Sequence, residues 1–67
     1  MHMSYTLLRP TANGMENVGC FETYRAIRAA SQEGYSYTVA EISDDHVEIE
    51  DDRGRMLYLI TWTRENN

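Results

Sequence analysis

The stretch that decides the fold is residues 41–63, EISDDHVEIEDDRGRMLYLITWT. Within it, Val47 and Ile49 alternate with polar residues, which is the period of a half-buried β-strand. Residues 51–55 combine two aspartates with a glycine and predict a tight turn. We therefore expect a β-hairpin in which a charged strand is followed by an apolar one.

Residues 56–63 form the apolar strand of this hairpin, and both of its faces are apolar. One face carries Met56, Tyr58, Ile60 and Trp62, and the other carries Leu57, Leu59 and Thr61. A strand of this kind is typically central in its sheet and covered on both faces. The chain contains only one helical pattern, so we expect something besides the helix to cover the second face.

The rest of the chain predicts a single small α+β domain over residues 1–67. The expected elements are strands at 4–9 and 35–42, a weaker strand at 15–19, a helix at 21–33, turns at 10–14 and 43–45, and a frayed tail at 64–67. Residue Gly34 is expected to end the helix. The fold class is an antiparallel four- to five-stranded sheet with one helix packed on one face, in the order β(β)αβββ.

Composition excludes several classes of function. The chain has 67 residues, so a deep substrate cavity is not expected. Its net charge of −5 argues against direct binding of nucleic acid or of an anionic membrane. A single cysteine, Cys20, excludes an internal disulfide and, without a signal peptide or a membrane-spanning run, predicts a cytoplasmic protein. No cofactor is expected, and no metal site, because the acidic run lacks the spacing of a calcium loop.

Seven of the eleven carboxylates lie between residues 41 and 52, and all six cations are arginine. Such a ribbon of negative charge is able to dock on a basic surface, whereas the simpler interpretation is a solvated strand between two aspartate-rich turns. We predict a protein-binding surface made by Glu48, Glu50, Asp44, Asp45, Asp51, Asp52, Tyr58 and Trp62.

The aromatic residues leave two interpretations open. The side chains concerned are Tyr35 and Tyr37 on one predicted strand and Tyr58 and Trp62 on another. They form either an exposed patch that contacts a partner, or the core beneath the helix. In the second case Leu57 and Leu59 face outward.

Catalysis has little support in the sequence. His46, beside Asp44 and Asp45, is the only acid–base candidate, and a single histidine in an acidic turn is typical of an exposed surface group. We therefore predict that the protein is not an enzyme.

The passage AIRAASQE at residues 26–33, followed by TVAEI at residues 38–42, resembles the helix-to-strand passage of some type I anti-CRISPR proteins. These are small inhibitors encoded by phages and other mobile elements. The resemblance implies an inhibitor that binds a CRISPR effector subunit and blocks target-DNA engagement or nuclease recruitment. It carries no motif, so no functional residue is transferred. The alternatives are a homodimeric regulatory or structural protein, such as an antitoxin or assembly factor, and a nucleic-acid-binding sheet that uses the aromatic residues.

Overall fold

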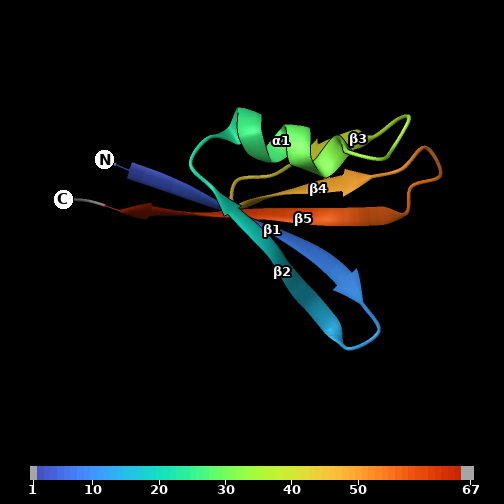
Figure 1. The fold of residues 1–67 in the computed structure, drawn as a ribbon, viewed down its shortest axis with the longest axis horizontal. Coiled ribbons are helices and arrows are strands. Elements are labelled where there is room, and N and C mark those ends of the chain that lie inside the picture. Colours follow the sequence, from blue (N-terminus) through green and yellow to red (C-terminus); the bar gives the residue numbers. More distant parts are fainter. Residues whose placement is uncertain (1, 66–67) are drawn as a thin grey trace.

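The computed structural model describes residues 2–65 and consists of a five-stranded antiparallel sheet with one α-helix (Figure 1). The elements are β1 (His2–Thr11), β2 (Gly14–Phe21), α1 (Tyr24–Gln32), β3 (Val39–Ile42), β4 (His46–Glu50) and β5 (Met56–Glu65). The order ββαβββ confirms the predicted α+β class, and the weaker strand predicted at residues 15–19 is present as β2.

Strand β5 lies at the centre of the sheet, whose spatial order is β2-β1-β5-β4-β3. It pairs with β4 through the predicted hairpin and with β1 from Leu59 to Glu65. The prediction that residues 56–63 form a central strand is therefore confirmed. The frayed tail was predicted to begin at residue 64, which is wrong because β5 continues to residue 65; residues 66–67 lie outside the described part of the chain.

The β1–β2 hairpin extends beyond the rest of the sheet. Pairing between β1 and β5 ends at the Leu8–Leu59 pair, whereas β1 and β2 remain paired up to Thr11 and Gly14. Figure 1 shows this hairpin diverging steeply from β4 and β5. Pro10 is tolerated inside β1 because it lies where β5 no longer pairs and needs no N–H from that side.

Helix α1 begins later than the predicted residue 21, because Phe21 still pairs with Tyr5 as the last residue of β2. Thr23 caps the helix: its backbone is extended and its Oγ1 accepts a hydrogen bond of 3.1 Å from the Ala26 N–H. The helix ends at Gln32, one residue before the predicted end. Gly34 follows the C-cap residue Glu33 as expected, and its φ of +86° is the left-handed conformation that glycine adopts without strain. No helix in residues 2–65 is long and apolar enough to cross a membrane.

Strand β3 is shorter than the predicted residues 35–42. It pairs with β4 from Ile42–Val47 to Val39–Glu50, and β4 ends there because the next residue starts a turn. Residues 35–38 thus have no neighbouring strand with which to pair. Instead the Tyr35 N–H donates to the Gln32 carbonyl at 3.1 Å, which continues the turn at the end of the helix.

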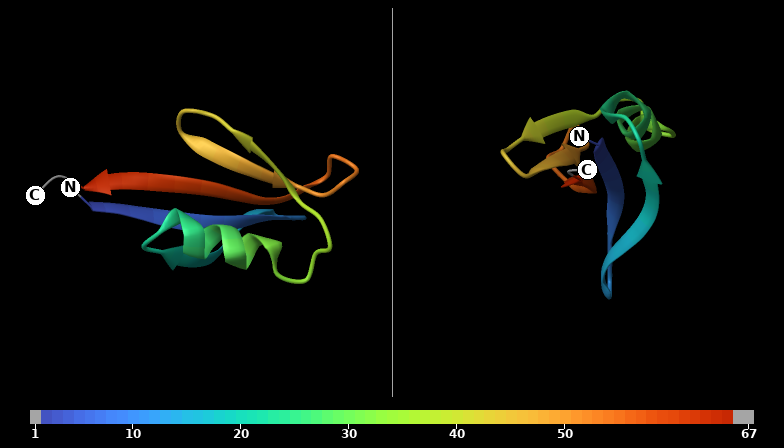
Figure 2. Two further views of the ribbon diagram at one scale, coloured as in Figure 1. Left: turned by 90° about the horizontal axis from the view of Figure 1, so that it is seen from above. Right: turned by 90° about the vertical axis from the view of Figure 1, so that its left-hand side faces the viewer.

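The core lies on one side of the sheet, between the strands and α1 (Figure 2). Its fully buried apolar residues are Leu7, Ile27, Val47, Ile49 and Ile60. Helix α1 packs on β1, β2 and β5. The sheet therefore has one face that carries the helix and one helix-free face within residues 2–65.

Candidate functional site

Three glutamates converge on the helix-free face of the sheet. Glu48 and Glu50 flank the buried Ile49 on β4, so their side chains point away from the core. Glu41 on β3 is the register partner of Glu48 and joins them from the neighbouring strand. Carboxylate oxygens of the three residues lie within 4.8 Å of one another. We refer to Glu41, Glu48 and Glu50 as the glutamate cluster.

The glutamate cluster adjoins an apolar strip at the centre of the same face. Leu59 on β5 is the register partner of Glu48, and Leu8 on β1 is the partner of Leu59. Both leucines are half-buried although no helix lies over them. Leu59 therefore faces outward, as the interpretation that places the aromatic residues in the core requires. Leu57 lies beside it in β5, where the β4–β5 register shifts. Partly solvated leucines beside a group of carboxylates match the composition of protein interfaces, which have an apolar centre and a polar rim.

No cation of the described residues neutralises the glutamate cluster. The ion pairs formed within residues 2–65 are Arg9–Glu16, at 2.8 Å, and His46–Asp45, at 2.7 Å. The first links β1 to β2, and a hydrogen bond to the Glu16 carboxylate raises the pKa of the Arg9 guanidinium. The glutamate cluster therefore has no ion-pair partner among the described residues.

The two aspartates of the β4–β5 turn have different roles. Asp51 Oδ1 accepts hydrogen bonds of 2.9 Å from the backbone N–H groups of Arg53 and Arg55. The bond from Arg55, reinforced by the one from Arg53, holds the pKa of Asp51 below its ordinary value. Asp52 is exposed. Both aspartates were predicted to bind a partner. Asp51 uses its carboxylate for hydrogen bonds within the turn, whereas Asp52 is the one exposed to solvent.

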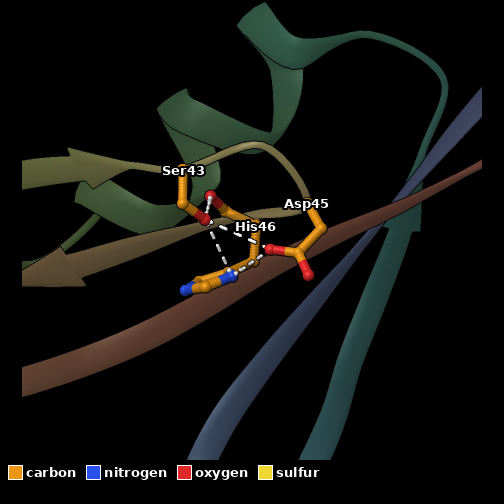
Figure 3. A network of polar contacts seen from close by, with 3 residues as sticks. All are labelled: Ser43, Asp45 and His46. Carbon is orange, nitrogen blue, oxygen red and sulfur yellow. Dashed lines mark hydrogen bonds and ion pairs between the residues drawn. The ribbon is translucent and has the colours of Figure 1, made fainter.

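The β3–β4 turn contains a cluster of Ser43, Asp45 and His46 (Figure 3). Asp45 Oδ1 lies 2.7 Å from His46 Nδ1, and this hydrogen bond, followed by one from Ser43, lowers the pKa of Asp45. Ser43 Oγ lies 2.9 Å from the same ring nitrogen. A catalytic triad needs its acid and its hydroxyl on opposite nitrogens of the imidazole. The three residues therefore stabilise the turn and are not arranged for nucleophilic catalysis.

Tyr58 and Trp62 lie on the helix side of the sheet, opposite the face that carries Glu48 and Glu50, whereas Trp62 and the predicted Asp44 line the same pocket. Both pack partly buried against the core, as the second interpretation of the aromatic residues required. Tyr35 leaves the sheet but packs its ring edge-on against Tyr58 at 6.3 Å, and Tyr37 is 60% exposed in the loop before β3. The prediction that Tyr35 and Tyr37 lie on one strand is wrong, because β3 begins only at Val39. A continuous aromatic sheet face able to stack bases is absent from residues 2–65.

The glutamate cluster is also the place where the described residues offer oxygen ligands to a divalent cation. Exposed acidic groups often gather without binding a metal, and the expectation of no dedicated metal site stays a prediction.

Two residues of this surface were not predicted from the sequence to belong to it. Glu41 was recognised as acidic but not assigned to the site, and Leu8 was not considered. The signal for both is strand register, since each enters the surface only through its partner on the neighbouring strand.

No protein-family model matches this chain, and neither a curated protein nor a solved structure is significantly similar to it.

Proposed function

We propose that this protein is an anti-CRISPR-like inhibitor that binds a nucleic-acid-handling complex in the cytoplasm, with its helix-free face docked on a basic surface of the target. The observation that carries the proposal is the glutamate cluster, in which three carboxylates from two strands lie within 4.8 Å without a cation of the described residues beside them.

The cluster has no evident benefit for folding. Two like charges at this separation repel each other by about 1 kcal/mol even in water, and more where solvent is partly excluded. A strand that needed only a solvated face would be served by neutral polar residues. A row of carboxylates on a stiff sheet suits a partner that supplies several arginine or lysine side chains, as the nucleic-acid grooves of proteins do.

The leucines beside the cluster support a protein partner. A solvated acidic strand does not need an apolar strip next to it, whereas protein interfaces combine an apolar centre with a polar rim. Leu8 and Leu59 supply the centre, and the glutamate cluster supplies the rim. The resemblance of residues 26–33 and 38–42 to type I anti-CRISPR proteins supplies the class of target, a CRISPR effector subunit.

The test is affinity capture from a bacterial lysate that contains CRISPR effectors, followed by mass spectrometry and by measurement of the affinity for the recovered complex. We expect recovery of a nucleic-acid-handling complex and loss of binding for the double variant Glu48→Lys/Glu50→Lys. The matched control is Glu22→Lys/Glu33→Lys, which changes the net charge equally at exposed positions outside the helix-free face. Equal losses for both variants would mean that only the overall charge matters, and retained binding by the first would refute the proposed surface.

A homodimer is the second candidate, and the half-exposed Leu59 favours it. A two-fold axis that passes through the leucines parallel to the strands would place each glutamate cluster over the β1 and β2 side of the other copy. There the helix-free face carries Thr6, Leu8 and Cys20, which have no positive charge, so the carboxylates would lose solvent without gaining a partner. Sedimentation at twice the monomer mass, reduced by Leu59→Gln, would instead favour the dimer.

A further inference from the structure

A pocket of about 320 Å³ opens on the helix side of the sheet, away from the glutamate cluster. It lies between the start of α1, the β3–β4 turn and the paired ends of β1 and β5. Its lining residues are Met3, Tyr5, Tyr24, Ile42, Asp44, Val47, Trp62 and Arg64. Ligand pockets occupy roughly 300–1,000 Å³. This one is at the lower end and fits one large side chain better than a cofactor.

Three aromatic rings form much of the wall. The Tyr5 ring lies 6.1 Å from that of Tyr24 and 6.3 Å from that of Trp62, at interplanar angles of 61° and 59°. The rings are therefore inclined to one another and do not stack into one flat layer. All three aromatic residues line the pocket, and the face of an aromatic ring attracts cations.

The pocket also contains one acid and one base. Asp44 is exposed and makes no ion pair with any described residue, so its carboxylate is open to a ligand. Arg64 carries the opposite charge and opposes a cationic ligand. The net charge of −5 on the whole chain shifts the balance toward cations.

We propose that this pocket binds an arginine side chain of a partner protein. A guanidinium is planar, is weakly hydrated, stacks on aromatic faces and pairs with a carboxylate through two parallel hydrogen bonds. An ammonium group is more strongly hydrated and cannot stack. This site does not depend on the proposed function of the helix-free face, because it lies on the other side of the sheet and uses none of the glutamate cluster.

Trp62 is the only tryptophan of the chain, so its fluorescence reports directly on the pocket. We would titrate the protein with N-acetyl-arginine methylamide and, as a neutral probe of nearly the same shape, with N-acetyl-citrulline methylamide. Arginine should give a saturable change, with citrulline binding about tenfold more weakly, the range expected for a cation–π contact and one charged hydrogen bond. The lysine analogue should also bind more weakly than arginine. Equal responses to arginine and citrulline, or no response to either, would overturn the proposal.

Charge variants show whether the pocket prefers a cationic or an anionic ligand. Asp44→Asn should weaken arginine binding and Arg64→Gln should strengthen it. Asp52→Asn, the same change in the other exposed loop, should leave it unaltered. The opposite result at Asp44 and Arg64 would identify the pocket as an anion site and refute the proposal.

A ring variant tests the aromatic wall. Tyr24→Phe keeps the π face and should bind arginine as the wild type does, whereas Tyr24→Leu should lose most of the binding. Circular dichroism of each variant confirms that the fold is retained. Equal affinity of the two Tyr24 variants would show that the ring contributes nothing.

Discussion

The two faces of β5 belong to the same strand but differ in burial and in what packs against them. On one face Tyr58, Ile60 and Trp62 pack under α1 or beside it, and Ile60 is completely buried. On the other face Leu59 stays half-buried, with the glutamate cluster next to it. Within residues 2–65 one helix covers one face of the sheet, so this small domain has a one-sided core and its second face remains partly solvated.

The largest expected difference between the faces is in stability. Ile60→Ala should lower the free energy of unfolding by about 2–5 kcal/mol, because it opens a cavity in the core. Leu59→Ala should lower it by roughly 1 kcal/mol, because this side chain is already partly solvated. Urea denaturation followed by circular dichroism measures both.

A domain of this size has a total stability on the order of 3–10 kcal/mol, so Ile60→Ala leaves little margin. The milder Ile60→Val, expected to lose about 0.5–1.5 kcal/mol, keeps the comparison measurable. Equal losses at positions 59 and 60 would mean that both faces are covered in solution, as in a dimer.

The helix cap is the next test, because α1 is what distinguishes the two faces. Thr23→Ala removes the hydrogen bond to the Ala26 N–H and should reduce stability by about 1 kcal/mol. Ser36→Ala, in the exposed loop after the helix, should change it by less than about 0.5 kcal/mol. Thermal unfolding distinguishes the two, and an unchanged melting temperature for Thr23→Ala would show that the cap is unimportant.

Neutralising the glutamate cluster should stabilise the fold. Glu48→Gln removes repulsion from Glu41 and Glu50 and should raise the free energy of unfolding by up to about 1 kcal/mol at low salt. The gain should shrink as salt screens the charges. Glu33→Gln, an exposed control at the end of α1, should have little effect. A loss of stability for Glu48→Gln would indicate that the cluster has a structural role.

The smallest effect is expected in the pH dependence of the β4–β5 turn. The pKa of Asp51 is lower in the folded protein than in the unfolded chain, so its contribution to stability is present above the unfolded value of about 3.9 and is lost as pH falls through the folded value. Asp51→Asn should therefore flatten the decline in stability below about pH 4, whereas Asp52→Asn should not. Denaturation midpoints measured from neutral pH down to acid check this, and parallel curves for wild type and Asp51→Asn would contradict it.

Local patterns in the sequence predicted much of this molecule. Alternation of Val47 and Ile49 placed Glu48 and Glu50 together on one face, and Gly34 marked the end of the helix. The predicted strand at residues 35–42 is not formed at residues 35–38. These residues favour a strand, but β4 ends at Glu50 and leaves them no neighbouring strand with which to pair.

The pocket shows why part of the candidate chemistry could not be read from the chain. Tyr5, Tyr24 and Trp62 are far apart in sequence, and they meet only through the pairing of β1 with β5 and the placement of α1 above them. Leu8 and Glu41 likewise join the surface on the helix-free face only through the pairing of their strands with the neighbouring ones.

The sequence by itself determined the elements of this protein: a charged strand joined to an apolar strand, one amphipathic helix, and a large excess of acid near the hairpin. These follow from periodicity and turn chemistry, which act over a few neighbouring residues. Only the tertiary structure decided which face of β5 the helix covers. Both faces of that strand are apolar, so alternation alone cannot distinguish them, and the choice depends on the register with β1 and β4 and on where α1 packs.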